Sequence, residues 1–271
     1  VYQLKVTTTA DKNWFKFYAG SNFVSDDWNS INKGALGCKE NGSEDTFGYI
    51  LYDGDSWGKL QTPVIPGAGT WIVTLDMNNL TYSVGKPVLY MKGDANGWDG
   101  YDYLSGDDGV KFTGFMYLNQ NGFKFTTASD WNGTNYGANF DTAKDAANIT
   151  MTEPAGYYKV DVDLSAKTYT LYPITSISMI GDATPGGWDA DTDLTYNATE
   201  RCWEIKDVHL EAKELKFRSN HSWDDPNPNW GGTPDALVQK GGNIKVAEDG
   251  KYDVKLYAWA NGYAKCELIK K

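Results

Sequence analysis

Hydrophobic and polar residues alternate along much of the chain with a period of two. The alternation is clear in residues 157–164 and 251–256, where it places apolar side chains on one face of an extended segment and polar ones on the other. Clusters of Gly, Asn, Asp and Pro bound such segments, as is typical of turns between strands. No segment keeps helical spacing over a dozen residues. The pattern predicts an all-β protein of antiparallel β-sandwich modules.

One order of motifs recurs along the chain. A turn that begins Gly93-Asp and reaches Trp98 is followed by the strand Phe123-Lys-Phe125 and then by Asp130-Trp-Asn132. Recurrence of a whole motif order at a fixed spacing is the sign of repeated structural units.

The third part of the chain has the same order, with Trp188, Leu215-Lys-Phe217 and Ser222-Trp-Asp224. Each copy takes about 90 residues, and the connections between copies are short, with no Gly/Ser-rich or Pro-rich tract. Short connections favour a semi-rigid row of modules. The expected modules are residues 1–85, 86–173 and 174–271.

The first copy departs from this pattern. Phe15-Lys-Phe17 and Asp27-Trp-Asn29 are present, but no Gly-Asp turn with a Trp precedes them. We therefore expect its opening strand to be missing from the sequence. Lys33 stands where the second copy has Tyr136, so the site of this module is expected to be degenerate, with Trp57 as a substitute aromatic surface.

Composition and charge narrow the classes of partner. The chain has 11 Trp and 18 Tyr, a formal net charge of −11 and a pI near 4.6. Nucleic-acid binding needs a basic surface that displaces counterions, so this balance opposes it. No apolar run approaches the roughly 20 residues that a membrane-spanning helix needs. A neutral polysaccharide is compatible with the charge, and outward-facing aromatics suit it.

Sugars present C–H patches on their ring faces and hydroxyls around the rim. A binding site therefore needs flat aromatic surfaces and a few directed hydrogen-bonding groups. Strand alternation puts Phe123 and Phe125 on the core face with Lys124 opposite, and the third copy repeats this around Lys216 and Arg218. The expected carbohydrate-binding residues are Trp98, Lys124, Trp131, Tyr136, Trp188, Lys216, Arg218, Trp223 and Trp230, with Lys144 and Lys240 as weaker additions.

The motif order, with Trp131 and Trp223 each seven residues after a strand lysine, resembles glycogen- and starch-binding modules. The tandem arrangement without a catalytic domain resembles the SusE/SusF family of Bacteroidetes surface starch-binding lipoproteins. This resemblance implies capture of starch-like α-1,4-glucan at the outer membrane, an N-terminal lipid anchor absent from this sequence, and a glycan importer and surface glycosidases as partners.

Two other readings stay open. A protein of this family could hold another glycan, such as mannan, xylan, fructan or host glycan, because the sequence gives no angle between the aromatic rings. The modules could also have a structural role in an outer-membrane uptake complex, since tryptophans are often largely buried.

The sequence contains no clear signature of a catalytic, metal or cofactor site. The histidines His209 and His221 belong to no hydrolase, zinc or phosphate-loop signature. The Asp-rich segment 189–193 imitates a calcium loop, but Leu194 stands where that loop needs Gly. Cys38, Cys202 and Cys266 form an odd set without metal-ligand spacing. Pairing of Cys202 with Cys266 is left open.

Overall fold

The computed structural model describes residues 1–19, 34–38, 46–52, 60–100 and 102–271. Contacts divide the chain into two compact units. The first comprises Val1–Pro87 with Asp107–Gly109, and the second comprises Val88–Gly106 with Val110–Lys271. The expected division into three modules stays a prediction.

The first unit is built on a four-stranded sheet in the order β1-β8-β9-β5. Its core includes Leu36, Ile50, Val73 and Val84. Smaller sheets pair β2 with β7 and arrange β3, β4 and β6. The strands are β1 (Tyr2–Thr8), β2 (Asn13–Trp14), β3 (Phe17–Tyr18), β4 (Ala35–Gly37), β5 (Phe47–Tyr49), β6 (Leu51–Tyr52), β7 (Val64–Ile65), β8 (Gly69–Asp76) and β9 (Thr81–Gly85).

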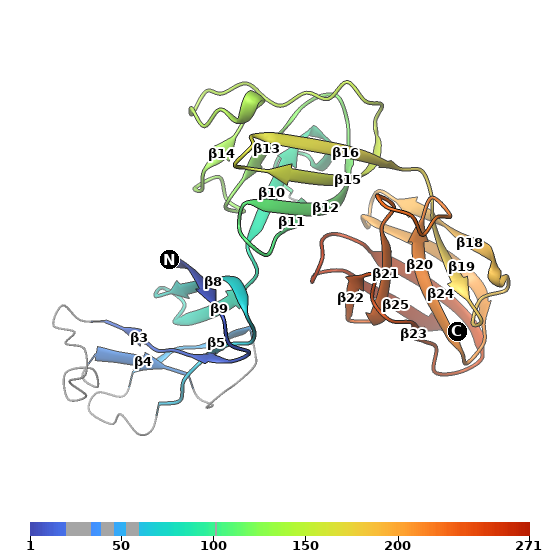
Figure 1. Cartoon of the computed structure of the whole chain (residues 1–271), viewed down its shortest axis with the longest axis horizontal. Coiled ribbons are helices and arrows are strands. Elements are labelled where there is room, and N and C mark those ends of the chain that lie inside the picture. Colours follow the sequence, from blue (N-terminus) through green and yellow to red (C-terminus); the bar gives the residue numbers. More distant parts are fainter. Residues whose placement is uncertain (20–33, 39–45, 53–59, 101) are drawn as a thin grey trace. The chain divides into compact units, whose positions relative to one another are not determined.

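A seven-stranded antiparallel sheet opens the second unit, in the order β14-β13-β10-β11-β12-β15-β16. Single-turn helices η1 (Asp94–Asn96) and η2 (Ala138–Phe140) interrupt the loops. In Figure 1, β15 and β16 run side by side beyond β12, as their pairing requires. The strands are β10 (Val88–Gly93), β11 (Asp102–Ser105), β12 (Lys111–Leu118), β13 (Phe123–Thr126), β14 (Asn135–Tyr136), β15 (Gly156–Asp163) and β16 (Thr168–Ile174).

The rest of the second unit forms a nine-stranded arrangement in the order β22-β21-β20-β17-β18-β19-β24-β25, with β23 beside β20. The long β18 pairs with β17 through its first part and with β19 through its last residues, so it joins the two layers. The strands are β17 (Ile177–Gly181), β18 (Gly187–Asn197), β19 (Cys202–Leu210), β20 (Glu214–Ser219), β21 (Asn229–Thr233), β22 (Ala236–Gln239), β23 (Ile244–Lys245), β24 (Gly250–Tyr257) and β25 (Lys265–Lys270).

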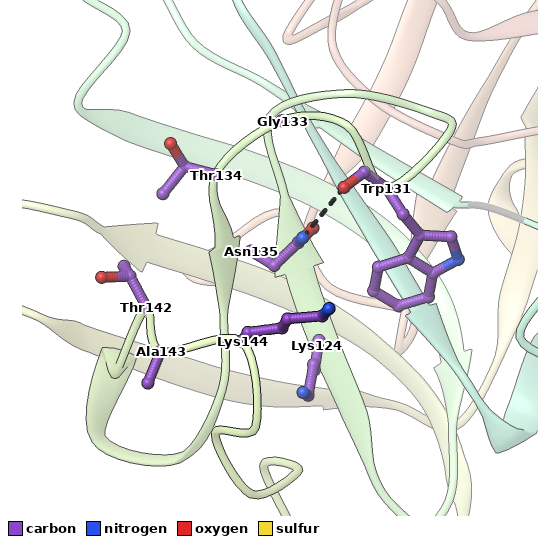
Figure 2. A pocket seen from close by; sticks show the side chains of 8 residues that line it. All are labelled: Lys124, Trp131, Gly133, Thr134, Asn135, Thr142, Ala143 and Lys144. Atoms are coloured by element: carbon purple, nitrogen blue, oxygen red, sulfur yellow. Dashed lines mark hydrogen bonds between the residues drawn. The ribbon is translucent and has the colours of Figure 1, made fainter.

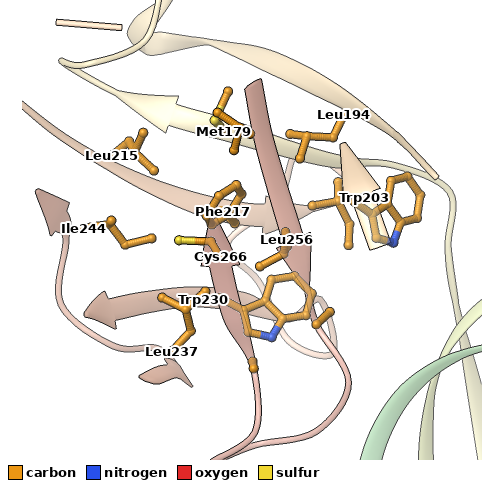
Figure 3. Close-up of a cluster of buried hydrophobic side chains, with 14 of the residues drawn as sticks. Met179, Leu194, Trp203, Leu215, Phe217, Trp230, Leu237, Ile244, Leu256 and Cys266 are labelled. Atoms are coloured by element: carbon orange, nitrogen blue, oxygen red, sulfur yellow. The ribbon is translucent and has the colours of Figure 1, made fainter. Parts of the chain in front are cut away.

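Burial follows the predicted alternation. In β15 and β24 buried and less buried residues alternate over most of the strand. Figure 3 shows inward-facing side chains from the C-terminal part of the second unit, including Phe217, Trp230 and Leu256, gathered in one cluster. The all-β class with β-sandwich modules is confirmed, and no helix of seven or more residues occurs in the described ranges.

The two sheets of the second unit share apolar contacts. Phe115 of β12 and Tyr157 of β15 belong to the same buried cluster as the core residues of β17 to β25. The Phe115 and Trp230 rings meet edge-on, with centroids 5.1 Å apart. The backbone N–H of Phe115 donates to the Trp259 carbonyl oxygen at 2.6 Å. A shared apolar cluster couples the stability of its two halves.

All three cysteines of the chain are enclosed in the protein. Cys38, Cys202 and Cys266 are buried, and Cys202 and Cys266 are free thiols. Burial raises the pKa of Cys202 to about 11 and that of Cys266 to about 12, so both thiols stay protonated at neutral pH. Within the described residues, helices long and apolar enough to cross a membrane are absent.

Candidate carbohydrate-binding sites

The Gly-Asp turn of the second copy is built by one asparagine. Asn96 Oδ1 accepts from the Gly93 N–H at 2.9 Å, while Asn96 Nδ2 donates to the Met91 carbonyl at 3.0 Å and to Asp102 Oδ2 at 3.1 Å. Gly93 is extended, and a Cβ there would lie 2.5 Å from Phe123 Cβ. The motif therefore lets β13 pass close to the turn, which ends at Trp98.

Trp98 and Trp131 come from separate loops and meet. Both have left-handed backbones, with φ of 60° and 67°. Their ring centroids are 6.3 Å apart and their planes are inclined by 24°. Asn135 Nδ2 holds the second loop by donating to the Trp131 carbonyl at 3.0 Å. The two indoles thus form one offset-stacked apolar surface, which the sequence predicted only as separate residues.

A pocket of about 450 Å³ lies beside Trp131. Figure 2 shows Lys124 of β13 and Lys144 of the loop after η2 in this space, next to the indole. Asn135 Oδ1 is buried there and accepts no hydrogen bond in the described part of the chain. The lining is Lys124, Trp131, Gly133, Thr134, Asn135, Thr142, Ala143 and Lys144.

Lys92 was not among the expected site residues. It is directly opposite Lys124 in the pairing of β10 with β13, and only 4% of its surface is exposed. Its Nζ lies 5.2 Å from the centroid of the Trp131 ring. Directly paired residues share a face, so Lys92 joins Lys124 beside Trp131, but the register that brings them together is not marked by the pattern within either strand.

In the third copy the two expected tryptophans are open to solvent. Trp188 is 41% exposed and Trp223 is 42% exposed. Arg218 Cζ lies 4.9 Å and Lys216 Nζ 5.4 Å from the centroid of the Trp223 ring. Burial lowers the pKa of Lys216. The strand therefore presents two cations next to one accessible indole face.

Arg218 is fixed by a carboxylate. Its Nε donates to Asp191 Oδ1 at 2.9 Å and its Nη2 donates to Asp191 Oδ2 at 2.5 Å. Ser178 Oγ also donates to Asp191 Oδ1, at 2.5 Å. The hydrogen bond from Arg218 is the main cause that lowers the pKa of Asp191. This member of the Asp-rich segment thus orients an arginine beside Trp223.

The prediction that Trp230 forms an aromatic binding surface in the third copy is wrong. Trp230 is fully buried, because it lies opposite the core residue Phe217 in the pairing of β20 with β21. Residues paired across strands point to the same side of the sheet, so Trp230 faces inward. An enclosed ring offers no face to a sugar.

Tyr136 lies opposite Phe125 in the matching pairing of the second copy. It is half-buried, packs against the core cluster and contacts Phe140 with ring centroids 6.2 Å apart. Its part in binding stays a prediction.

Lys240, a weaker addition to the expected site, and His221 each have an acidic partner. Lys240 Nζ forms an ion pair with Asp225 at 3.0 Å, and His221 Nε2 lies 2.6 Å from Asp193 Oδ1. In the first copy, Phe15 and Phe17 meet edge-on at 5.3 Å. Lys33 and Trp57, with the Asp27-Trp-Asn29 motif, lie outside the described residues.

Comparison with known proteins adds a family match. Residues 1–86 match the family model described as "SusF, first starch specific CBM". Over residues 1–86 the resemblance to SusF is thereby confirmed. A crystal structure of SusF from Bacteroides thetaiotaomicron matches 98% of this chain with 20% identity and a TM-score of 0.40. The match covers 65% of that SusF chain, and no curated relative matches.

Proposed function

We propose that this chain binds starch or a related α-1,4-glucan without breaking a bond, through tandem modules of residues 1–85, 86–173 and 174–271. Trp98 with Trp131 forms one aromatic surface, and Trp188 with Trp223 supplies another. Lys124, Lys216 and Arg218 donate hydrogen bonds to sugar hydroxyls at these surfaces. The protein captures polysaccharide at the bacterial cell surface for import.

One observation carries the proposal. In both copies the tryptophan seven residues after the strand lysine has cations close to its ring, at 5.2 Å for Lys92 and Trp131 and at 4.9 Å for Arg218 and Trp223. A flat apolar ring bordered by donors fits a sugar, whose C–H face stacks while its rim accepts hydrogen bonds. The starch-specific description of the matching family model supports α-glucan as the sugar.

The sites are shallow, so each is expected to bind weakly, with Kd on the order of micromolar to millimolar. Several sites on one long polymer raise the apparent affinity through effective concentration. Anchoring by a lipid and cooperation with a glycan importer and surface glycosidases belong to the same proposal and rest on the family resemblance.

A second candidate is a flat, β-linked glycan. The Trp98 and Trp131 planes are inclined by only 24°, whereas a curved amylose helix is better matched by splayed rings. The same surfaces would then hold xylan or a similar polymer, and the test below separates the two.

The test is electrophoresis of the whole chain in native gels that contain amylopectin, xylan, mannan or no polysaccharide. Retardation by amylopectin alone, lost in steps in Trp98→Ala, Trp223→Ala and the double variant, is the expected result. Tyr117→Ala removes another exposed aromatic, on β12, and serves as the control. Retardation by xylan alone would replace the α-glucan proposal with the second candidate, and unchanged mobility in every gel would refute both.

A further inference from the structure

Three lysines converge on Trp131 in a chain whose net charge is −11. Lys124 and Lys144 line the pocket beside the indole, and Lys92 Nζ lies 5.2 Å from the ring centroid. Among the described residues, no carboxylate lies within ion-pair distance of any of these three ammonium groups. Two lysines of the pocket and Lys92 at the Trp131 ring therefore make a local concentration of positive charge on an acidic protein.

This arrangement costs stability. Lys92 and Lys124 are direct cross-strand partners, and like charges in that position repel. Only 4% of the Lys92 surface is exposed, which confines its charge beside the Trp131 ring. Contact with the Trp131 ring offsets only part of this cost. Such a cost is typical of a site whose compensating group arrives with the ligand.

The nearby carboxylates are already engaged or exposed. Asp130 Oδ1 and Oδ2 accept from the N–H and Nδ2 of Asn132 at 3.2 and 2.9 Å. Asp141 Oδ1 accepts from the Ala143 N–H at 3.0 Å, and Asp145 is exposed. The Asn132 side chain is the main cause that lowers the pKa of Asp130, and Lys92 makes a smaller contribution.

The third copy provides an internal comparison. Ile180 occupies the position of Lys92, so Lys216 faces an apolar partner across the strands. Arg218 is neutralised by Asp191 and Lys240 by Asp225. Within the described residues, one of the two cations beside Trp223 is therefore balanced by a carboxylate, whereas none of the three lysines at Trp131 is. The two sites differ in charge although they share one motif order.

We propose that the Trp131 site accepts a glucan that carries a phosphate monoester, with the sugar on the indoles and the phosphate among Lys92, Lys124 and Lys144. A phosphate monoester carries about −1.5 to −2 charges at neutral pH and three acceptor oxygens, which suits three ammonium groups better than a single carboxylate does. This inference rests on the proposed function, because it assigns a substrate class to one of its sites.

The test is calorimetric titration of the whole chain in a Trp188→Ala/Trp223→Ala background, which removes the other site. The probes are phosphorylated maltooligosaccharides and the same oligosaccharides after phosphatase treatment. We expect about tenfold tighter binding of the phosphorylated form at about 0.05 M salt, with most of this preference lost at about 0.5 M salt. Lys124→Gln and Lys144→Gln should each reduce the ratio of the two affinities.

Lys92→Met should abolish the preference, and the exposed Lys144→Gln keeps the test valid if the buried substitution prevents folding. Lys167→Gln, in the exposed turn between β15 and β16, removes the same charge elsewhere and should leave the ratio unchanged. Equal affinity for both probes would overturn the inference while leaving the proposed function intact. Binding of neither probe would count against the proposed function itself, and equally tight binding of polygalacturonate oligomers would overturn the assignment to phosphate.

Discussion

Trp223 and Trp230 lie seven residues apart and differ completely in exposure, at 42% and 0%. Trp223 lies in a loop beside two cations, whereas Trp230 packs edge-on against Phe115. Trp230→Ala should therefore lower the free energy of unfolding by about 3–5 kcal/mol, and Trp223→Ala by less than about 0.5 kcal/mol. Urea titration checks this, and a comparable loss of stability in both variants would contradict it.

Asp191 allows a second prediction for a single residue. Its pKa is lowered in the folded protein, chiefly by the hydrogen bond from Arg218, so its charged form stabilises the fold above the unfolded pKa of 3.8. That contribution is lost as the pH falls through the lower, folded pKa. Asp191→Asn should cost about 1.5–3 kcal/mol at pH 7, and the difference from the parent should shrink below pH 3.8.

Denaturation of both proteins at pH 7 and at about pH 3 measures this difference. The exposed Asp193→Asn serves as a control, since His221 is the one side-chain partner of Asp193 among the described residues. A difference that stays constant across the pH range would show that Asp191 does not act through its charge.

Alternation within a strand predicted which side chains face the core, but it did not predict which residues meet across neighbouring strands. Alternation placed Phe123 and Phe125 inside and Lys124 outside, as the structure has them. It could not place Trp230, because the pairing with Phe217 that turns this ring inward joins strands ten or more residues apart. Lys92 was missed for the same reason. Period within a strand is a local property, whereas register between strands is set by the whole sheet.

At the scale of elements, the glycine of the Gly-Asp motif controls how closely neighbouring strands pass. A Cβ on Gly93 would lie 2.5 Å from Phe123 Cβ, and one on Gly181 would lie 2.5 Å from the Glu214 carbonyl oxygen. Gly181 also has φ of 140°. Both copies therefore need glycine here so that β13 can pair with β10 and β20 with β17.

Gly93→Ala and Gly181→Ala should each destabilise the protein by about 2 kcal/mol or more, because backbone or core atoms must shift. Gly242→Ala is the control, since a Cβ there meets nothing within 4 Å. Thermal unfolding of the three variants provides the comparison. A loss as large in the Gly242 variant as in the others would contradict the close-approach explanation.

For the molecule as a whole, the second unit carries both candidate surfaces on parts that share an apolar cluster through Phe115 and Tyr157. Residues 88–271 should therefore unfold in one transition, and Phe115→Ala should lower its melting temperature. The melting temperature of residues 1–87 should not change. Calorimetry of the whole chain tests this through the number of transitions. A change in the transition of the first unit alone would refute the coupling.

Two weak sites on one molecule should act together only when one ligand is long enough to reach both. Linking turns the second binding event into an intramolecular one, so a long glucan gains about 10²- to 10⁴-fold in apparent affinity when the geometry permits, and a short oligosaccharide gains nothing. Trp98→Ala or Trp223→Ala should then weaken binding of amylose far more than binding of maltoheptaose. Titration of each variant with both ligands measures the two ratios, and equal ratios would mean that the sites act independently on long glucan.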